Sequence, residues 1–192
     1  MSRTEWRNVL LLALTVVVIT TAPYLVAWSK QNDDWRFSGF LFGVEDGNSY
    51  IGKMRLGARG VWDFFLFYTP EAHDGVPLVF LPYIIPGQIV GHFIGDTDPA
   101  LTPALIVTYH LMQAIFDALL VVVVYRFAAA FLDQPRDRLI ATILATLGGG
   151  LGWYLSLTGQ SALPADFYIP EGFSFLILFG LPHLALARAA LL

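Results

Sequence analysis

Two unbroken apolar runs constrain this chain more than any other feature. They extend from Val9 to Trp28 and from Leu101 to Tyr125, and about 20 apolar residues in a helix cross the hydrocarbon core of a membrane. The composition agrees, because 56% of the 192 residues are hydrophobic and 14% are charged, whereas soluble domains average about 25% charged residues. We therefore expect an all-α integral membrane protein.

Two shorter apolar segments extend this prediction to about four transmembrane helices in a single membrane domain, 1–192. The crossings are predicted at 8–28, 101–125, 139–157 and 173–192. Outer loops are predicted at 29–76, with surface helices, and at 158–172. Basic residues precede the first crossing and follow the second, and they favour a cytoplasmic N-terminus. These residues are Arg3, Arg7, Arg126, Arg136 and Arg138.

The segment 77–95 is apolar but contains several prolines, each of which removes a backbone hydrogen bond from a helix. If the arginines after Tyr125 are cytoplasmic, the chain has to be outside at Pro99. We therefore predict that 77–95 does not cross, and that it is a proline-broken interfacial or re-entrant segment.

The stretch Gly43 to Met54 places two adjacent carboxylates, Glu45 and Asp46, between an apolar run and a helix predicted from Asn48 to Arg59. A carboxylate in a partly apolar site can act as a general base toward a hydroxyl group. The alternative is structural, because Asp46 and Asn48 can cap the helix by accepting hydrogen bonds from its first N–H groups. In this helix the pattern places Tyr50 and other apolar residues on one side and Lys53 on a more polar side.

Further candidate residues lie in the two predicted outer loops and just after them: His73, Asp74, Asp166, Glu171 and His183. For His73-Asp74-Gly75 the alternative is a tight turn, and for the two later acids it is a solvated loop. A divalent metal remains open, but no spacing resembles a metal motif and none is predicted. The chain has no cysteine, and its net charge of −4 makes nucleic acid an unfavourable partner.

The run from Leu101 to Tyr125 also carries three polar residues at offsets of three and four, His110, Gln113 and Asp117. This spacing places them on one helix face. Polar groups inside a membrane segment normally face other helices or a polar cavity. We interpret them as a structural stripe that joins helices, and a role in transport stays open.

The order of these features resembles the start of the GT-C class of polytopic membrane glycosyltransferases, which includes protein mannosyltransferases and aminoarabinose transferases. Glu45-Asp46-Gly47-Asn48-Ser49-Tyr50 occupies the place of the acidic motif in the first outer loop of that class. The stretches Asp166 to Glu171 and Leu181-Pro182-His183 resemble the second acidic loop and the helix that follows it in bacterial members.

The resemblance implies transfer of sugar from a polyprenyl-phosphate donor at the outer face of a bacterial or archaeal cytoplasmic membrane. Asp46 would act as base, assisted by Glu45 or Glu171. Tyr50, Lys53, His73, Asp74, Asp166 and His183 would bind substrate, with no cofactor. Members of the class have more crossings, so we expect a protein partner or further helices to complete the bundle. The alternative is a non-catalytic structural subunit of a larger membrane complex.

Overall fold

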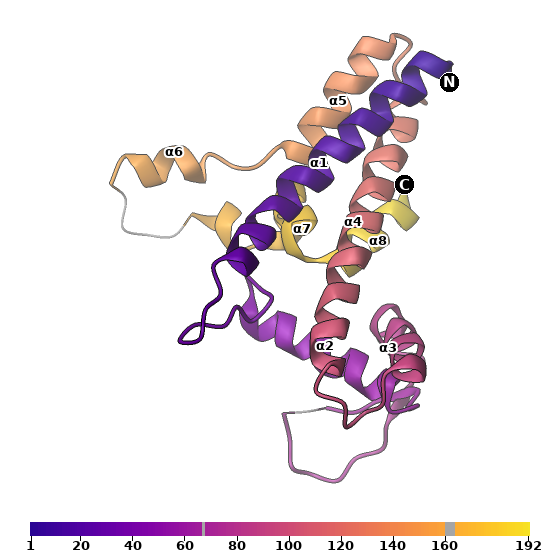
Figure 1. Cartoon of the computed structure of the whole chain (residues 1–192). Helices are drawn as coiled ribbons and strands as arrows, with labels where there is room; N and C mark the ends of the chain where they lie inside the picture. Colours follow the sequence, from indigo (N-terminus) through magenta and orange to yellow (C-terminus); the bar gives the residue numbers. More distant parts are fainter. Residues whose placement is uncertain (67, 160–163) are drawn as a thin grey trace. The chain divides into compact units, whose positions relative to one another are not determined.

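The computed structural model describes residues 1–66, 68–159 and 164–192, and helices make up 66% of the chain (Figure 1). The elements in chain order are α1 (Arg3–Ser29), α2 (Val44–Ala58), β1 (Asp63–Phe64), β2 (Val76–Pro77), α3 (Leu81–Phe93), α4 (Leu101–Ala128), α5 (Pro135–Leu147), α6 (Gly152–Leu157), the 3₁₀ turns η1 (Ala165–Phe167) and η2 (Pro170–Gly172), α7 (Ser174–Gly180) and α8 (Pro182–Leu191). The two short strands pair antiparallel, with Asp63 opposite Pro77.

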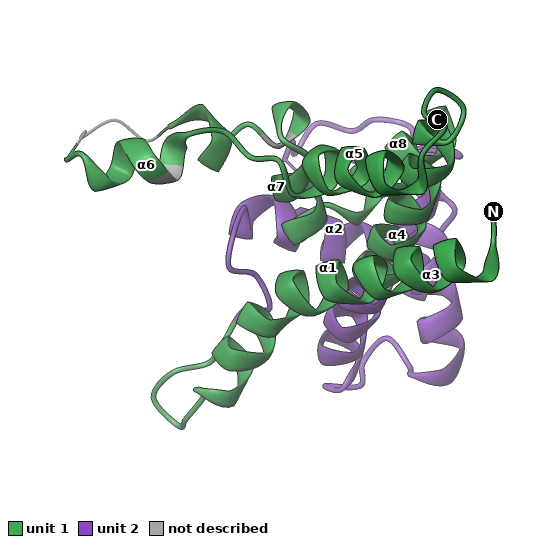
Figure 2. Ribbon diagram, turned by 90° about the horizontal axis from the view of Figure 1, so that it is seen from above, with its two compact units in different colours: residues 1–37, 112–192 green, residues 38–111 purple. Residues whose placement is uncertain are grey.

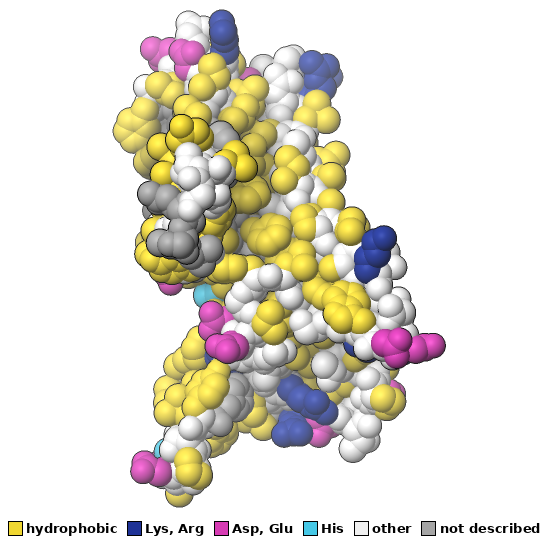
Figure 3. All heavy atoms as spheres, turned by 90° about the vertical axis from the view of Figure 1, so that its left-hand side faces the viewer, with side chains coloured by type: hydrophobic (Ala, Val, Ile, Leu, Met, Phe, Trp, Pro, Cys, Tyr) yellow, Lys and Arg dark blue, Asp and Glu magenta, His cyan; other side chains and the backbone are white. Residues whose placement is uncertain are grey.

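Helices α1 and α4 are long and apolar enough to cross a membrane, as the sequence predicts. They contain 27 and 28 residues, which corresponds to about 40 Å of helix at 1.5 Å per residue. Both leave large apolar side chains exposed, among them Leu14 (59% exposed) and Ile115 (62%). Figure 3 shows such hydrophobic side chains over much of the visible surface. Exposed apolar area of this kind suits contact with lipid or with other apolar helices.

Four crossings are not shown. Within 139–157, α5 ends at Leu147, and the chain is not helical from Gly148 to Gly150 before the six residues of α6. Within 173–192, the seven residues of α7 end at Gly180, and α8 begins at Pro182. Glycine destabilises the interior of a helix, which separates α5 from α6. Proline has no N–H group to donate the hydrogen bond that would continue α7. Each of these two predicted crossings is therefore divided into two shorter helices.

The segment 77–95 also differs from the sequence expectation, because α3 is continuous over 13 residues and is not broken by its prolines. Pro82 lies in the first turn, where a missing N–H is tolerated, and Pro86 lies inside the helix. A helix of this length spans about 20 Å, which is shorter than the hydrocarbon core of about 30 Å. That α3 does not cross remains a prediction.

The chain divides into two compact units (Figure 2). Unit 1 comprises residues 1–37 and 112–192, and unit 2 comprises residues 38–111. Unit 1 contains α1, residues 112–128 of α4, and α5 to α8. Unit 2 contains α2, the β1–β2 hairpin, α3 and the start of α4.

In unit 2, α2 and α3 pack with their backbones in contact through glycines. A Cβ atom on Gly57 of α2 would collide with the carbonyl of Ile84, and one on Gly87 of α3 would collide with the carbonyl of Met54. Gly91, four residues after Gly87, meets Ala58 in the same way. Small residues at this spacing let two helices approach closely. These three glycine contacts could not be predicted from the sequence.

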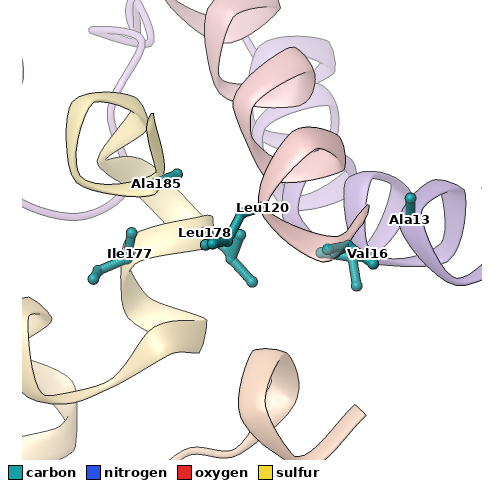
Figure 4. Close-up of a cluster of buried hydrophobic side chains, with 7 residues drawn as sticks. Ala13, Val16, Leu120, Ile177, Leu178 and Ala185 are labelled. Carbon is teal, nitrogen blue, oxygen red and sulfur yellow. The ribbon is translucent and has the colours of Figure 1, made fainter. Parts of the chain in front are cut away.

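A hydrophobic cluster joins α1, α4, α7 and α8 in unit 1 (Figure 4). Its buried members are Ala13, Val16, Leu120, Val121, Ile177, Leu178 and Ala185. Near one end of the unit, the Glu5 carboxylate accepts hydrogen bonds from the Tyr125 hydroxyl (3.1 Å) and the Arg138 guanidinium (2.8 Å). These contacts bring together the start of α1, the end of α4 and the start of α5.

Candidate functional site

The first turn of α2 carries the two carboxylates that the sequence analysis places at the centre of the site. Gly43 precedes the helix in the left-handed conformation, with φ +56°, and Val44 is the first helical residue. Glu45 and Asp46 therefore lie in the first turn, and both are exposed. Negative charge is favourable there, because the free N–H groups at a helix start carry partial positive charge.

The structural alternative, in which Asp46 and Asn48 cap the helix, is wrong. Both residues lie inside α2, and the N-cap position is Gly43, which has no side chain to accept a hydrogen bond. The helix begins four residues before the predicted Asn48 because the left-handed glycine starts it. Capping therefore does not account for the carboxylate of Asp46.

Lys53 lies on α2 seven residues after Asp46, and its environment differs from the predicted polar face. The residue is 6% exposed. Its Nζ atom lies 4.3 Å from the ring centre of Phe80, 4.7 Å from that of Tyr50 and 5.7 Å from that of Phe64. Aromatic faces attract a cation electrostatically, and more strongly where water is excluded. The ammonium also donates a hydrogen bond of 2.8 Å to the Ser49 hydroxyl.

Two opposing effects set the protonation of Lys53. Burial lowers the pKa of its ammonium below the ordinary value, and the negative charge of Asp46 acts in the opposite direction and raises it. Burial is the larger effect, because the charged form loses its hydration. Asp46 and Lys53 are thus electrostatically coupled across two turns of one helix. Helix α2 thus carries an exposed carboxylate and, two turns later, a cation surrounded by aromatic rings.

Tyr50 takes a packing role in this arrangement. Its ring stacks on Tyr83 of α3 with centres 4.7 Å apart, and the Tyr83 ring in turn stacks on Tyr109 of α4 at 6.1 Å. Offset stacking of this kind stabilises aromatic pairs beyond their buried area. Tyr50 therefore links α2 to α3 and α4 within unit 2 while it also forms one wall around Lys53.

His73 and Asp74 lie in the loop between β1 and β2. The Nε2 atom of His73 accepts from the Leu66 amide at 3.0 Å, and its Nδ1 atom lies 2.8 Å from the Glu71 carbonyl. One neutral tautomer satisfies both contacts, so His73 closes the loop. The tight turn predicted at His73-Asp74-Gly75 is not formed. Asp74 is exposed.

The later candidates belong to unit 1. The Asp166 carboxylate accepts a hydrogen bond of 2.8 Å from the Gly152 amide and so fastens η1 to α6. The Glu171 carboxylate is exposed, and its backbone carbonyl accepts from Arg188 at 2.6 Å. His183 lies half-buried in the first turn of α8. The structure therefore places Glu45, Asp46 and Lys53 on one helix of unit 2, and it places Glu171 in the other unit.

The predicted polar stripe on α4 makes hydrogen bonds in both units. His110 contacts the Gly39 carbonyl at 2.8 Å in unit 2, and Gln113 donates to the Leu178 carbonyl at 2.9 Å in unit 1. Asp117 contacts the Thr20 hydroxyl of α1 at 3.3 Å. The contacts of Gln113 and Asp117 join helices, which is the structural role predicted for the stripe, and His110 joins α4 to the loop before α2.

Sequence reasoning missed the partners of these polar residues. Thr20 and Tyr24 lie one turn apart within the apolar first helix, and the Tyr24 hydroxyl donates to the Phe179 carbonyl at 2.6 Å. Their spacing of four residues was the available signal. Among the residues that the structure describes, no group of three His, Cys, Asp or Glu side chains could hold a metal ion.

Comparison with known proteins finds no matching protein-family model, no similar curated protein and no similar solved structure.

Proposed function

We propose that this chain is a GT-C-like glycosyltransferase module that uses a polyprenyl-phosphate sugar at the outer face of a membrane. The observation that supports the proposal most directly is the pairing on α2 of the exposed Asp46 with the buried Lys53. This helix follows the first long apolar helix and precedes the second, and the sequence resemblance places the acidic motif of the class in the same loop.

In this proposal Asp46 is the base that accepts the proton of the acceptor hydroxyl. An exposed carboxylate at a helix start can reach a substrate that arrives from the water side. Lys53 supplies a positive charge on the same helix, held by aromatic rings. Glu45 is the nearest alternative carboxylate, one residue away. Glu171 stays a candidate for the second acidic position that the resemblance implies.

The proposed orientation places the N-terminus in the cytoplasm of a bacterial or archaeal cell and the α2 loop outside. The contacts of Glu5 support part of it, because they hold the start of α1 and the end of α4 at one end of unit 1. If α1 and α4 both cross the membrane, the chain between them then starts and finishes on the side opposite to Glu5. The charge pattern of the arginines favours the cytoplasm for the Glu5 end.

The experiment is sugar transfer from a polyprenyl-phosphate donor in reconstituted membranes, supplemented with the helices or partner that complete the bundle. Asp46→Asn should lower turnover by roughly 100-fold or more, the scale expected for the loss of a positioned base. Asp33→Asn is the matched control, because it removes another exposed carboxylate of the same predicted outer loop, and it should retain most of the activity. Full activity in Asp46→Asn would exclude Asp46 as the base, and transfer by none of the variants, wild type included, would favour the structural subunit.

A further inference from the structure

The strongest unexplained group outside the α2 site is Asp117, in the interior of unit 1. The residue is 0% exposed, and its Oδ1 atom has no hydrogen-bond partner among the described residues. None of the ion pairs formed by described residues includes Asp117. A buried carboxylate without compensating charge is strongly unfavourable. Either a proton or a cation has to balance it.

Helices α1 and α7 both contact α4 within one turn of this carboxylate. The Thr20 hydroxyl is 3.3 Å from Asp117 Oδ2. Tyr24, one turn after Thr20, interacts electrostatically with Asp117 and donates to the Phe179 carbonyl of α7. Gln113, one turn before Asp117, donates to the Leu178 carbonyl. The helix turns next to Thr20 and Asp117 therefore hold the end of α7.

The end of α7 adds negative potential to this position. The helix ends at Gly180, just before Leu181-Pro182, and Pro182 has no N–H group to continue the helical bonding to the Leu178 carbonyl. Carbonyls at a helix end carry partial negative charge. Each carbonyl oxygen has two lone pairs, and the hydrogen bonds from Tyr24 and Gln113 each use one. Broken helices with such carbonyl ends coordinate Na⁺ in membrane transporters.

We propose that unit 1 binds a small monovalent cation at Asp117. The ligands are the carboxylate oxygens of Asp117, the Thr20 hydroxyl oxygen and the carbonyl oxygens at the end of α7. All of these are oxygen atoms, which suit a hard cation of sodium size. A single carboxylate balances a single charge, which favours a monovalent over a divalent ion. The bound cation joins α1, α4 and α7, independently of the proposed transfer reaction.

The experiment measures thermal unfolding of the purified full chain in lipid nanodiscs, with NaCl exchanged for choline chloride at constant ionic strength. Binding to the folded state raises the melting temperature in a saturable way. Wild type should show this rise with Na⁺. Asp117→Asn should abolish it, and Thr20→Val should raise the half-saturating Na⁺ concentration by on the order of 10-fold, the effect of losing about 1.4 kcal/mol.

Thr142→Val is the matched control, since Thr142 is also buried and its hydroxyl donates to the Arg138 carbonyl of its own helix. It should leave the Na⁺ response of wild type unchanged. If Asp117→Asn does not fold, the Na⁺ titrations of wild type and of Thr20→Val still test the cation site. Equal melting in Na⁺ and choline, with an infrared band of a protonated carboxyl, would overturn the proposal in favour of a neutral structural Asp117. A Na⁺ response that survives in Asp117→Asn would overturn it as well.

Discussion

The ammonium of Lys53 lies 4.3 Å from the centre of the Phe80 ring. Phe80 is the residue just before α3, and its backbone has φ +57°, a conformation that bulky residues rarely adopt. Its ring also packs edge-on against Phe64 of β1, with centres 4.7 Å apart. The strained position of Phe80 thus brings one ring over a cation of α2 and against the hairpin, so Lys53 is held by side chains from three elements of unit 2.

The burial of Lys53 predicts a pH dependence of stability. The pKa of this ammonium is lower in the folded state than the value of about 10.4 for an exposed lysine. Between the two values the unfolded state binds more protons, so stability rises with pH. The contribution is complete above about pH 10.4 and is lost as pH falls through the folded pKa. The melting temperature of wild type minus that of Lys53→Met should therefore increase with pH across this window.

Lys30→Met removes an exposed lysine and serves as the control for the pH titration. The melting temperature of Lys30→Met should change with pH in the same way as that of wild type across this range. A difference between wild type and Lys53→Met that stays flat with pH would contradict the lowered pKa of Lys53.

The glycine contacts between α2 and α3 predict a sharp effect of a single methyl group. Gly87→Ala places a Cβ atom against the backbone carbonyl of Met54, which cannot rotate away. Overpacking of this kind costs about 1–3 kcal/mol. Gly95→Ala is the control, because no atom lies within 4 Å of its added Cβ. Equal melting temperatures for the two variants would show that α2 and α3 do not pack this closely.

The long helices of this fold could be predicted from the sequence, and the environment of the site could not. α1 and α4 were predictable because their apolar runs are longer than any core helix needs. The start of α2 was not, because Asp46 and Asn48 are good capping residues and the helix instead follows the left-handed Gly43. The burial of Lys53 depends on rings at positions 64 and 80, which are distant in sequence and carry no periodic signal.

The hydroxyl of Tyr24 predicts a stability effect inside unit 1. Tyr24→Phe removes the donor to the Phe179 carbonyl and leaves that partly buried carbonyl at the end of α7 without it. Leaving a buried polar group unpaired costs about 1–3 kcal/mol. Thr15→Val is the control, since Thr15 is exposed and bonds a carbonyl of its own helix. A loss in Tyr24→Phe no larger than in Thr15→Val would contradict a role for this hydrogen bond.

The orientation of the chain can be tested with single cysteines, because the natural sequence contains none. Asp98 lies just before α4, and Asp133 lies between α4 and α5. Both residues are exposed, so we choose the variants Asp98→Cys and Asp133→Cys. If α4 crosses and its end faces the cytoplasm, an impermeant thiol reagent added outside should label the cysteine at 98 and not the one at 133. The reverse pattern would invert the proposed topology, and labelling of both would show that α4 does not cross.

Asp46 is coupled to Lys53 and does not cap α2, and these two statements make separate predictions. Its negative charge raises the pKa of Lys53, so Asp46→Asn should lower that pKa further and move the pH window of Lys53 downward. Asp46→Ala should have the same effect and the same stability as Asp46→Asn, because α2 begins at Val44. A capping residue would instead make alanine about 1 kcal/mol less stable than asparagine.

Glu45→Gln separates the two contributions of the acidic pair, because it removes a charge from the same helix turn without removing the carboxylate that interacts with Lys53. Melting curves against pH for the three variants and for each combined with Lys53→Met form double-mutant cycles.

A coupling between positions 46 and 53 that exceeds the coupling between 45 and 53 is the expected result, since Asp46 is the residue that acts on Lys53. Equal couplings would mean that the charge of the whole helix start, and no specific pairing, sets the protonation of Lys53, and Asp46 would then have no advantage over Glu45 as the proposed base.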